Sequence, residues 1–201
     1  MKEQHPLKSV TLTVQPDSLH LFTTVLQAGV EIKTPMNTEI GFFLCQLPGF
    51  SPEYIQATIE TIFLNGTPVD DLNLHITGEH PVLALSAAMP GLAGAIFRKN
   101  SIHAALRTRT AVQPQTDREE NTLTVTLKLF NSIAKERGED LLQTGIELST
   151  PKLLTFLSKR SGLCENITDI EIDKNTVPLT NLSDSLAGCQ TINLKIITSN
   201  D

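Results

Sequence analysis

Gly29-Val30-Glu31-Ile32-Lys33-Thr34-Pro35 is echoed 116 residues later by Gly145-Ile146-Glu147-Leu148-Ser149-Thr150-Pro151. Four of the seven positions are identical, and two more exchange one aliphatic residue for another. Further matches follow at a constant offset of 110 residues: Ile62, Asn65, Pro68, Leu72, Gly78 and Val82 correspond to Ile172, Asn175, Pro178, Leu182, Gly188 and Ile192. An internal repeat decides the architecture of a chain, so two copies of one fold are predicted. The first copy is six residues longer and carries Leu47-Pro48-Gly49-Phe50-Ser51-Pro52 between the matched positions.

The repeated heptad is predicted to join a strand to a helix. Residues 30–32 alternate apolar and polar side chains, as a strand with one buried face does. Thr34 is expected to cap the helix and Pro35 to occupy its first turn, where a missing N–H costs nothing. Thr150 and Pro151 are expected to do the same in the second copy. In the first copy the apolar face of the helix is predicted to comprise Ile40, Phe43, Leu44 and Leu47, with Cys45 beside it as a small buried hydrophobe.

Alternating runs predict further strands on both sides of each helix. In the first copy they cover residues 9–14, 59–64, 67–69 and 82–86. In the second copy they cover residues 122–130, 170–173, 177–179 and 192–197. Asn65-Gly66 and Lys174-Asn175 are the predicted turns between the two middle strands of each copy. Each copy therefore has the order strand, strand, helix, strand, short strand, strand.

This order, with one helix crossing a small mixed sheet, resembles the β-grasp arrangement. The second copy is similar to the ubiquitin-like sulfur carriers, such as the small subunit of molybdopterin synthase and the carrier of the thiamine pathway. The residues that carry this resemblance are Leu127-Lys128-Leu129-Phe130, Ala134-Lys135-Glu136-Arg137-Gly138 and the turn from Leu182 to Gly188. The resemblance implies an α+β protein of two tandem β-grasp (ubiquitin-like) domains, at residues 1–110 and 122–201, joined by a polar linker at 111–121.

The C-terminus departs from that family. The sulfur carriers end in Gly-Gly, because the terminal carboxylate becomes a thiocarboxylate inside a narrow active site. This chain ends in Ile197-Thr198-Ser199-Asn200-Asp201. Sulfur transfer from this C-terminus is therefore not expected.

Composition narrows the classes of partner. The formal net charge of −6 argues against a nucleic-acid binder, which needs a surplus of Lys and Arg. Three widely spaced cysteines and five scattered histidines predict no disulfide scaffold, no metal site and no cofactor. The N-terminus lacks the apolar core of a signal peptide, and the longest mainly apolar stretch, residues 81–97, is too short to span a bilayer. A cytoplasmic protein without membrane contact is expected, and its oligomeric state stays open.

The segment 87–109 has no counterpart in the second copy, which makes it the candidate site. It combines small residues with a basic run in which no acidic residue occurs. A protein partner or a small anionic ligand would suit these groups, with backbone N–H donors near the glycines. The alternatives are a closely packed loop and a solvated or salt-bridged basic face. The candidate binding residues are Gly91, Gly94, Arg98, Lys99, His103, Arg107 and Arg109.

The predicted function is that of a non-catalytic binding or interaction module. Two alternatives stay open at this point. One is a sulfur-carrier-related protein in which proteolysis after Gly94 exposes a glycine carboxylate. The other is an enzyme whose site forms between the two domains.

Overall fold

The structure is a computed structural model that describes residues 7–87, 96–98 and 122–199. It divides the chain into two compact units that do not follow the order of the sequence. We call them the terminal unit, Met1–Val30 with Gly138–Asp201, and the central unit, Glu31–Arg137. The expected division into residues 1–110 and 122–201 differs from this one, because each unit combines residues from both copies of the repeat.

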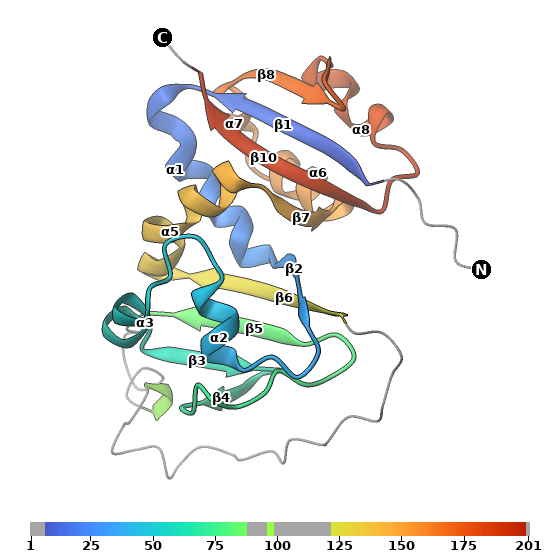
Figure 1. Cartoon of the computed structure of the whole chain (residues 1–201). Helices are drawn as coiled ribbons and strands as arrows, with labels where there is room; N and C mark the ends of the chain where they lie inside the picture. The colour runs from blue at the N-terminus through green and yellow to red at the C-terminus, as the bar shows by residue number, and fades with distance from the viewer. Residues whose placement is uncertain (1–6, 88–95, 99–121, 200–201) are drawn as a thin grey trace, which may run out of the picture. The chain divides into compact units, whose positions relative to one another are not determined.

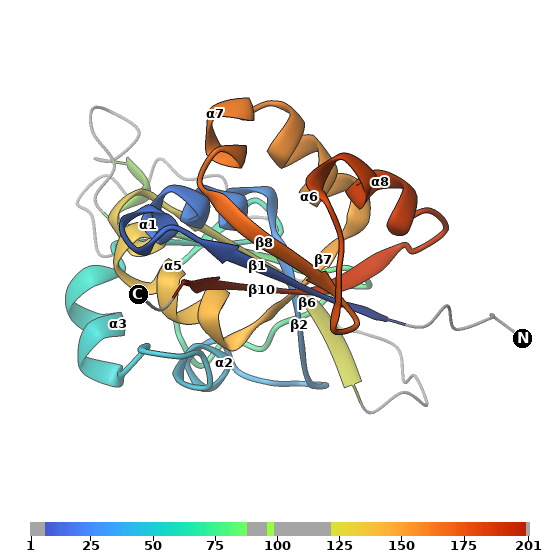
Figure 2. The same cartoon turned by 90° about the horizontal axis from the view of Figure 1, so that it is seen from above.

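The terminal unit contains five strands of a mixed sheet. Its strands lie in the order β7 (Ile146–Ser149), β10 (Thr191–Thr198), β1 (Lys8–Val14), β8 (Ile167–Ile172) and β9 (Asn175–Thr176). β1 and β10 are parallel, and the outer pairings are antiparallel. Its short helical segments are η1 (Pro16–Ser18), α1 (Leu19–Phe22), η2 (Thr23–Ala28), α6 (Thr150–Ser158), α7 (Ser161–Cys164), η4 (Leu179–Asn181) and α8 (Leu182–Ser185). Figures 1 and 2 show α6 and α7 on one face of this sheet.

The central unit also combines strands with helices, but the first and last strands of the repeat lie in the opposite order in it. Its strands lie in the order β4 (Thr67–Val69), β3 (Thr61–Leu64), β5 (Val82–Ser86), β6 (Thr122–Phe130) and β2 (Val30–Pro35). β5 and β6 form the central parallel pair, and β3 is antiparallel to both β4 and β5. The helices α2 (Ile40–Cys45) and α3 (Pro52–Thr58) follow β2. Helix α5 (Asn131–Thr144) follows β6, and the boundary between the units falls inside it.

The first strand of each copy pairs with strands of the other copy. β1 comes from the first copy, yet it pairs with β10 and β8 of the second copy, with Leu12 opposite Ile196 and Ile170. β6 comes from the second copy, yet it pairs with β5 of the first, with Leu127 opposite Leu83. Two consecutive, self-contained domains were the expectation, and this strand exchange is the difference. An architecture that combines helices with parallel and antiparallel strand pairs is what the structure supports.

Both exchanged strands are fully integrated into their sheets. Leu12 of β1 and Leu127 of β6 have no exposed surface, and the same holds for their apolar neighbours Val10, Val14 and Leu129. The alternation of buried and partly exposed residues along each strand is the one that the sequence predicts. Burying an aliphatic side chain contributes roughly 1.5–3 kcal/mol. Each unit therefore depends on a strand that the other copy supplies.

The repeated heptad begins with a residue that must be glycine in both copies. Gly29 has φ of 93° and Gly145 has φ of 107°, in the left-handed region that side chains disfavour. Each follows a helical segment and donates its N–H to that segment, Gly29 to Leu26 and Gly145 to Leu141. The glycine that the two copies share therefore ends a helical segment and leads into the following strand.

The end of the heptad differs from the expectation. β2 continues through Thr34 to Pro35, and the helix begins only at Ile40. Thr34 is buried and donates its hydroxyl to Thr38 Oγ1 at 3.0 Å, so it caps no helix. In the second copy α6 does begin at Thr150, but Thr150 lies inside the helix and its cap position is Ser149. The predicted threonine caps are therefore wrong in both copies, because each threonine is already part of a regular element.

One predicted turn is shifted as well. Asn65 and Gly66 form the predicted two-residue turn, with φ of 52° and 80°. In the second copy the turn residues are Asp173 and Lys174, because Ile172 pairs with Asn175. The following strand, expected at residues 177–179, lies at Asn175–Thr176. Within the described residues, no helix has the length and apolarity needed to cross a membrane.

Candidate functional site

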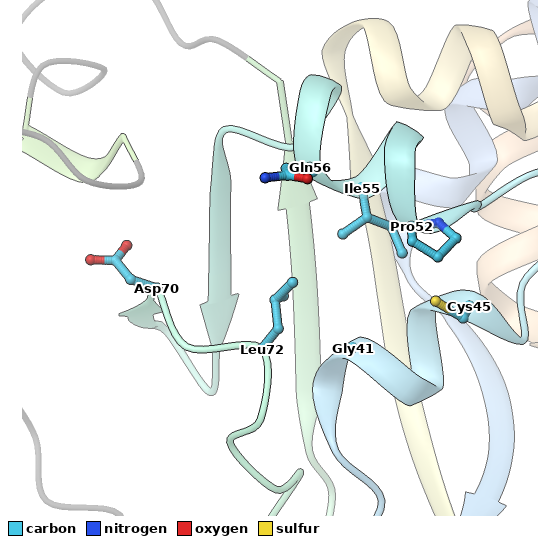
Figure 3. Close-up of a pocket in the computed structure, with 7 residues that line it drawn as sticks. All are labelled: Gly41, Cys45, Pro52, Ile55, Gln56, Asp70 and Leu72. Atoms are coloured by element: carbon cyan, nitrogen blue, oxygen red, sulfur yellow. The ribbon is translucent and has the colours of Figure 1, made fainter.

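A recess in the central unit is the candidate functional site. It has a volume of about 590 Å³ and lies between α2, α3 and residues 70–72. Figure 3 shows the side chains of Ile55 and Leu72 pointing toward one another across it, with the Cys45 sulfur on the α2 side. The lining residues are Gly41, Cys45, Pro52, Ile55, Gln56, Asp70 and Leu72.

The loop that forms one wall is tied to the start of α2 by backbone hydrogen bonds. Gly41 N–H donates to the Leu72 carbonyl at 2.8 Å, and Ile40 N–H donates to the Leu74 carbonyl at 3.0 Å. A side chain on Gly41 would have its Cβ only 3.3 Å from both Leu72 Cβ and the Leu72 carbonyl oxygen. Glycine therefore permits the loop to approach the helix closely, and the two N–H groups at the helix start are satisfied.

The second wall, α3, has a well-formed start. Ser51 is its cap residue, and the Ser51 hydroxyl accepts a hydrogen bond from the Tyr54 N–H at 3.2 Å. Pro52 occupies the first turn, where no N–H is needed. Glu53 lies in the same turn, and hydrogen bonds from its own backbone N–H and from Ser51 lower the pKa of its carboxyl. The six extra residues of the first copy end in this capping sequence.

On the side away from the lining, α3 is held by α5. The Tyr54 hydroxyl donates to Glu136 Oε2 at 2.9 Å, and the Arg137 guanidinium lies 4.1 Å from the centre of the Tyr54 ring. Phe50 packs edge-on against the same ring at 5.6 Å. Burial, with the Glu136 carboxylate, raises the pKa of Tyr54 to about 12. Because Tyr54 is next to Ile55, this cluster helps to fix the wall of the recess.

Cys45 corrects one expectation directly. It was predicted to be a small buried hydrophobe, but it is exposed and lines the recess. The apolar face of α2 consists of Ile40, Phe43 and Leu44, which are buried as predicted. Cys45 follows Leu44 around the helix and so faces outward. The recess thus offers mainly apolar walls with one thiol, one amide and one carboxylate.

The basic segment predicted as the binding site is described only at residues 96–98. The Arg98 guanidinium forms a bidentate ion pair with the Glu60 carboxylate, at 2.5 Å from Nε to Oε2 and 2.9 Å from Nη2 to Oε1. This cation therefore interacts within the chain. Phe97 packs on Phe63 of β3 with ring centres 5.4 Å apart. The other predicted site residues, Gly91, Gly94, Lys99, His103, Arg107 and Arg109, lie outside the described residues. Arg98, the described one, is not among the residues that line the recess.

Among the described residues, no group of three or more His, Cys, Asp or Glu side chains is arranged to hold a metal ion. Comparisons with protein-family models, with curated proteins and with solved structures found no match to this chain. The site must therefore be interpreted from its own geometry and chemistry.

The sequence did contain a signal for the recess. The two copies differ by six residues at Leu47–Pro52, and α3 begins at the end of that insertion. The sequence interpretation placed function in the other difference between the copies, the basic segment 87–109. The spatial neighbours Gly41 and Leu72 carried no signal of their own, because only the fold brings them together.

Proposed function

We propose that this chain is a binding protein and that the recess between α2, α3 and residues 70–72 accepts an apolar group of its partner. The observation that carries this proposal is the recess itself. Its volume of about 590 Å³ falls in the range of roughly 300–1,000 Å³ that is typical of ligand pockets. Ile55, Leu72 and Pro52 supply apolar walls, and Gln56 and Asp70 supply a few polar groups at the side.

The walls suit a preformed site. Backbone hydrogen bonds tie the 70–72 loop to α2, and the Ser51 cap and the Tyr54 cluster hold α3. A pocket whose walls are already ordered loses little conformational entropy on binding. An apolar group that enters it exchanges contact with water for contact with Ile55 and Leu72.

We also propose that each unit is a β-grasp unit whose first strand is supplied by the other copy. One feature supports this assignment: each unit contains a parallel strand pair, β1 with β10 and β5 with β6, and an antiparallel strand beside it, β8 and β3 respectively. The scaffold alone assigns no activity. The binding proposal therefore depends on the recess and not on the scaffold.

Small apolar probes test the proposal. Indole or cyclohexanol, titrated into labelled protein and followed by NMR, is expected to shift the signals of Gly41, Ile55 and Leu72. Cys45→Trp places a large side chain in the recess and is expected to abolish these shifts. Gln46→Trp is the matched control, since Gln46 is the next exposed residue of the chain and does not line the recess.

Two results would contradict this function. One is a set of shifts confined to residues away from the recess. The other is unchanged probe binding in a Cys45→Trp variant whose Tyr54 absorbance and circular dichroism remain those of the folded protein.

A further inference from the structure

The stretch of sequence that supplies every lining residue of the recess is acidic and contains no Lys or Arg. Between residues 34 and 97 there are six Asp and Glu residues and no Lys or Arg. The whole chain has twenty-two acidic and sixteen basic residues, so the remainder carries sixteen of each and is balanced. The net charge of −6 is therefore that of one stretch of 64 residues, which supplies every lining residue of the recess.

Four of these carboxylates lie at or beside the elements that form the recess. Glu39 directly precedes α2, Glu53 is in the first turn of α3, and Asp70 and Asp71 are in the loop. All four side chains are exposed. A surface that carries one sign of charge attracts ligands of the opposite sign and repels those of its own. Anionic lipids, nucleic acids and acidic peptides are thus disfavoured here.

An exposed aromatic side chain extends the apolar surface beyond the recess. Phe42 is 58% exposed, which is the largest value among the exposed apolar side chains of the described residues. It lies on α2 between the lining residues Gly41 and Cys45, and it is a helical neighbour of Cys45 three residues further on. Exposed aromatic residues beside a pocket are typical of protein-binding surfaces.

We propose that the recess binds a basic segment of a partner protein. An apolar side chain of that segment enters between Ile55 and Leu72, and its flanking Lys or Arg residues face Glu39, Glu53, Asp70 and Asp71. Phe42 packs against the apolar stems of those basic side chains, and against the part of the partner segment next to its apolar side chain. This proposal rests on the proposed function, because it names the chemistry of the partner that uses the same recess.

Three short labelled peptides test the charge and the anchor separately. The first has a central Leu between two Lys-Arg pairs, the second has Glu-Asp pairs in their place, and the third has Ala in place of Leu. By fluorescence anisotropy the first is expected to bind at least about tenfold more tightly than either of the others. Its affinity should fall as the salt concentration is raised from about 20 mM to about 200 mM, because exposed charges are screened.

Variants of the protein provide the matched controls. The double variant Glu39→Gln, Asp70→Asn is expected to weaken the basic peptide about fivefold, as two exposed charge contacts would. Asp184→Asn removes an exposed carboxylate of α8 in the terminal unit and is expected to change nothing. Cys45→Trp should abolish binding of the basic peptide, and Gln46→Trp should leave it.

The outcomes separate the two proposals. If indole still binds the recess but the basic and acidic peptides bind equally, the basic partner is refuted and the binding function stands. If neither indole nor any peptide binds, both are refuted. Tighter peptide binding after Lys99→Gln, Arg107→Gln and Arg109→Gln would also overturn the proposal, because the occupant would then be the chain's own basic segment.

Discussion

The exchange of first strands predicts that a substitution in one copy weakens the unit built mainly from the other. Leu12 of β1 has no exposed surface and lies opposite Ile196 and Ile170. Leu12→Ala removes about three carbons, roughly 2.4 kcal/mol of transfer free energy, and leaves a cavity. Measured costs for such substitutions are about 2–5 kcal/mol, so we expect about 3 kcal/mol. That cost corresponds to roughly a 100-fold loss of protection against amide hydrogen exchange.

Hydrogen exchange measured residue by residue locates the loss. In Leu12→Ala the amides of β8 and β10 are expected to lose protection, while those of β3 and β5 keep theirs. Leu127→Ala is the matched variant, because Leu127 is equally buried and lies opposite Leu83 of β5. It is expected to show the reverse pattern. Loss of protection in β3 and β5 after Leu12→Ala would refute the exchange.

A cross-link tests the same pairing without relying on separate unfolding of the units. Thr11 lies opposite Lys195 in the parallel pair of β1 and β10. Neighbouring strands are about 4.8 Å apart, which falls within the Cα spacing of about 4.4–6.8 Å that disulfides span. Thr11→Cys with Lys195→Cys, in a chain without its native cysteines, is expected to form an intramolecular disulfide. Val82 of β5 lies opposite Thr126, the counterpart of Thr11 in the second copy. Thr11→Cys with Val82→Cys is therefore expected to form no disulfide, and the opposite result would contradict the exchange.

Two further predictions concern single side chains. Absorbance titration of Tyr54, the only tyrosine of the chain, should give a pKa of about 12, and Glu136→Gln should lower it. Because this pKa exceeds the ordinary value of 10.0, the stability that the folded environment of Tyr54 contributes is complete below about pH 10 and is lost as the pH rises through about 12. A titration midpoint of Tyr54 near 10 would contradict the contact with Glu136. In denaturant unfolding, Thr34→Val should cost about 1 kcal/mol, because it removes the hydrogen bond to Thr38. Thr150→Val should be neutral or stabilising, since no partner for its buried hydroxyl is found in the described part of the chain, and the reverse ranking would refute this reasoning.

The strands could be predicted from the sequence with good accuracy. β4, β5 and β6 match the predicted ranges residue for residue, β1 begins one residue earlier, and β10 extends by one residue at each end. Alternation of apolar and polar residues is a local property, and it directly reflects one buried face. The local pattern was less accurate for β8, which begins three residues before the predicted range, and for β9, which lies before its predicted range.

The partners of the strands could not be predicted in the same way. Val10-Thr11-Leu12 of β1 recurs as Val125-Thr126-Leu127 of β6, so the two strands present nearly the same buried face. Either strand would satisfy the alternation of either sheet. Which sheet each joins depends on the connections and on the tertiary packing, neither of which a periodic pattern encodes.

Helix α5 escaped prediction for a different reason. Its buried residues, Ile133, Ala134, Leu141 and Leu142, leave a polar interval between them, and Gly138 lies in the middle. Such a helix has a weak apolar stripe, and glycine lowers helix propensity by about 1 kcal/mol. The close approach of Thr23, whose Cβ would be 2.8 Å from a Cβ on Gly138, explains why glycine is nevertheless present.

The residues that the two copies share and the residues that differ between them have different roles, and the recess is an example. Positions that the copies share, such as Gly29 and Gly145, serve the backbone joints of a fold that is built twice. A structural feature found in only one copy must depend on residues that the other copy lacks. The insertion Leu47–Pro52 meets that condition, since it ends in the start of α3 and so supplies the wall that contains Ile55. The basic segment 87–109 meets it as well, but its one described cation, Arg98, is paired with Glu60. The difference between the copies that contributes residues to the recess is therefore the insertion.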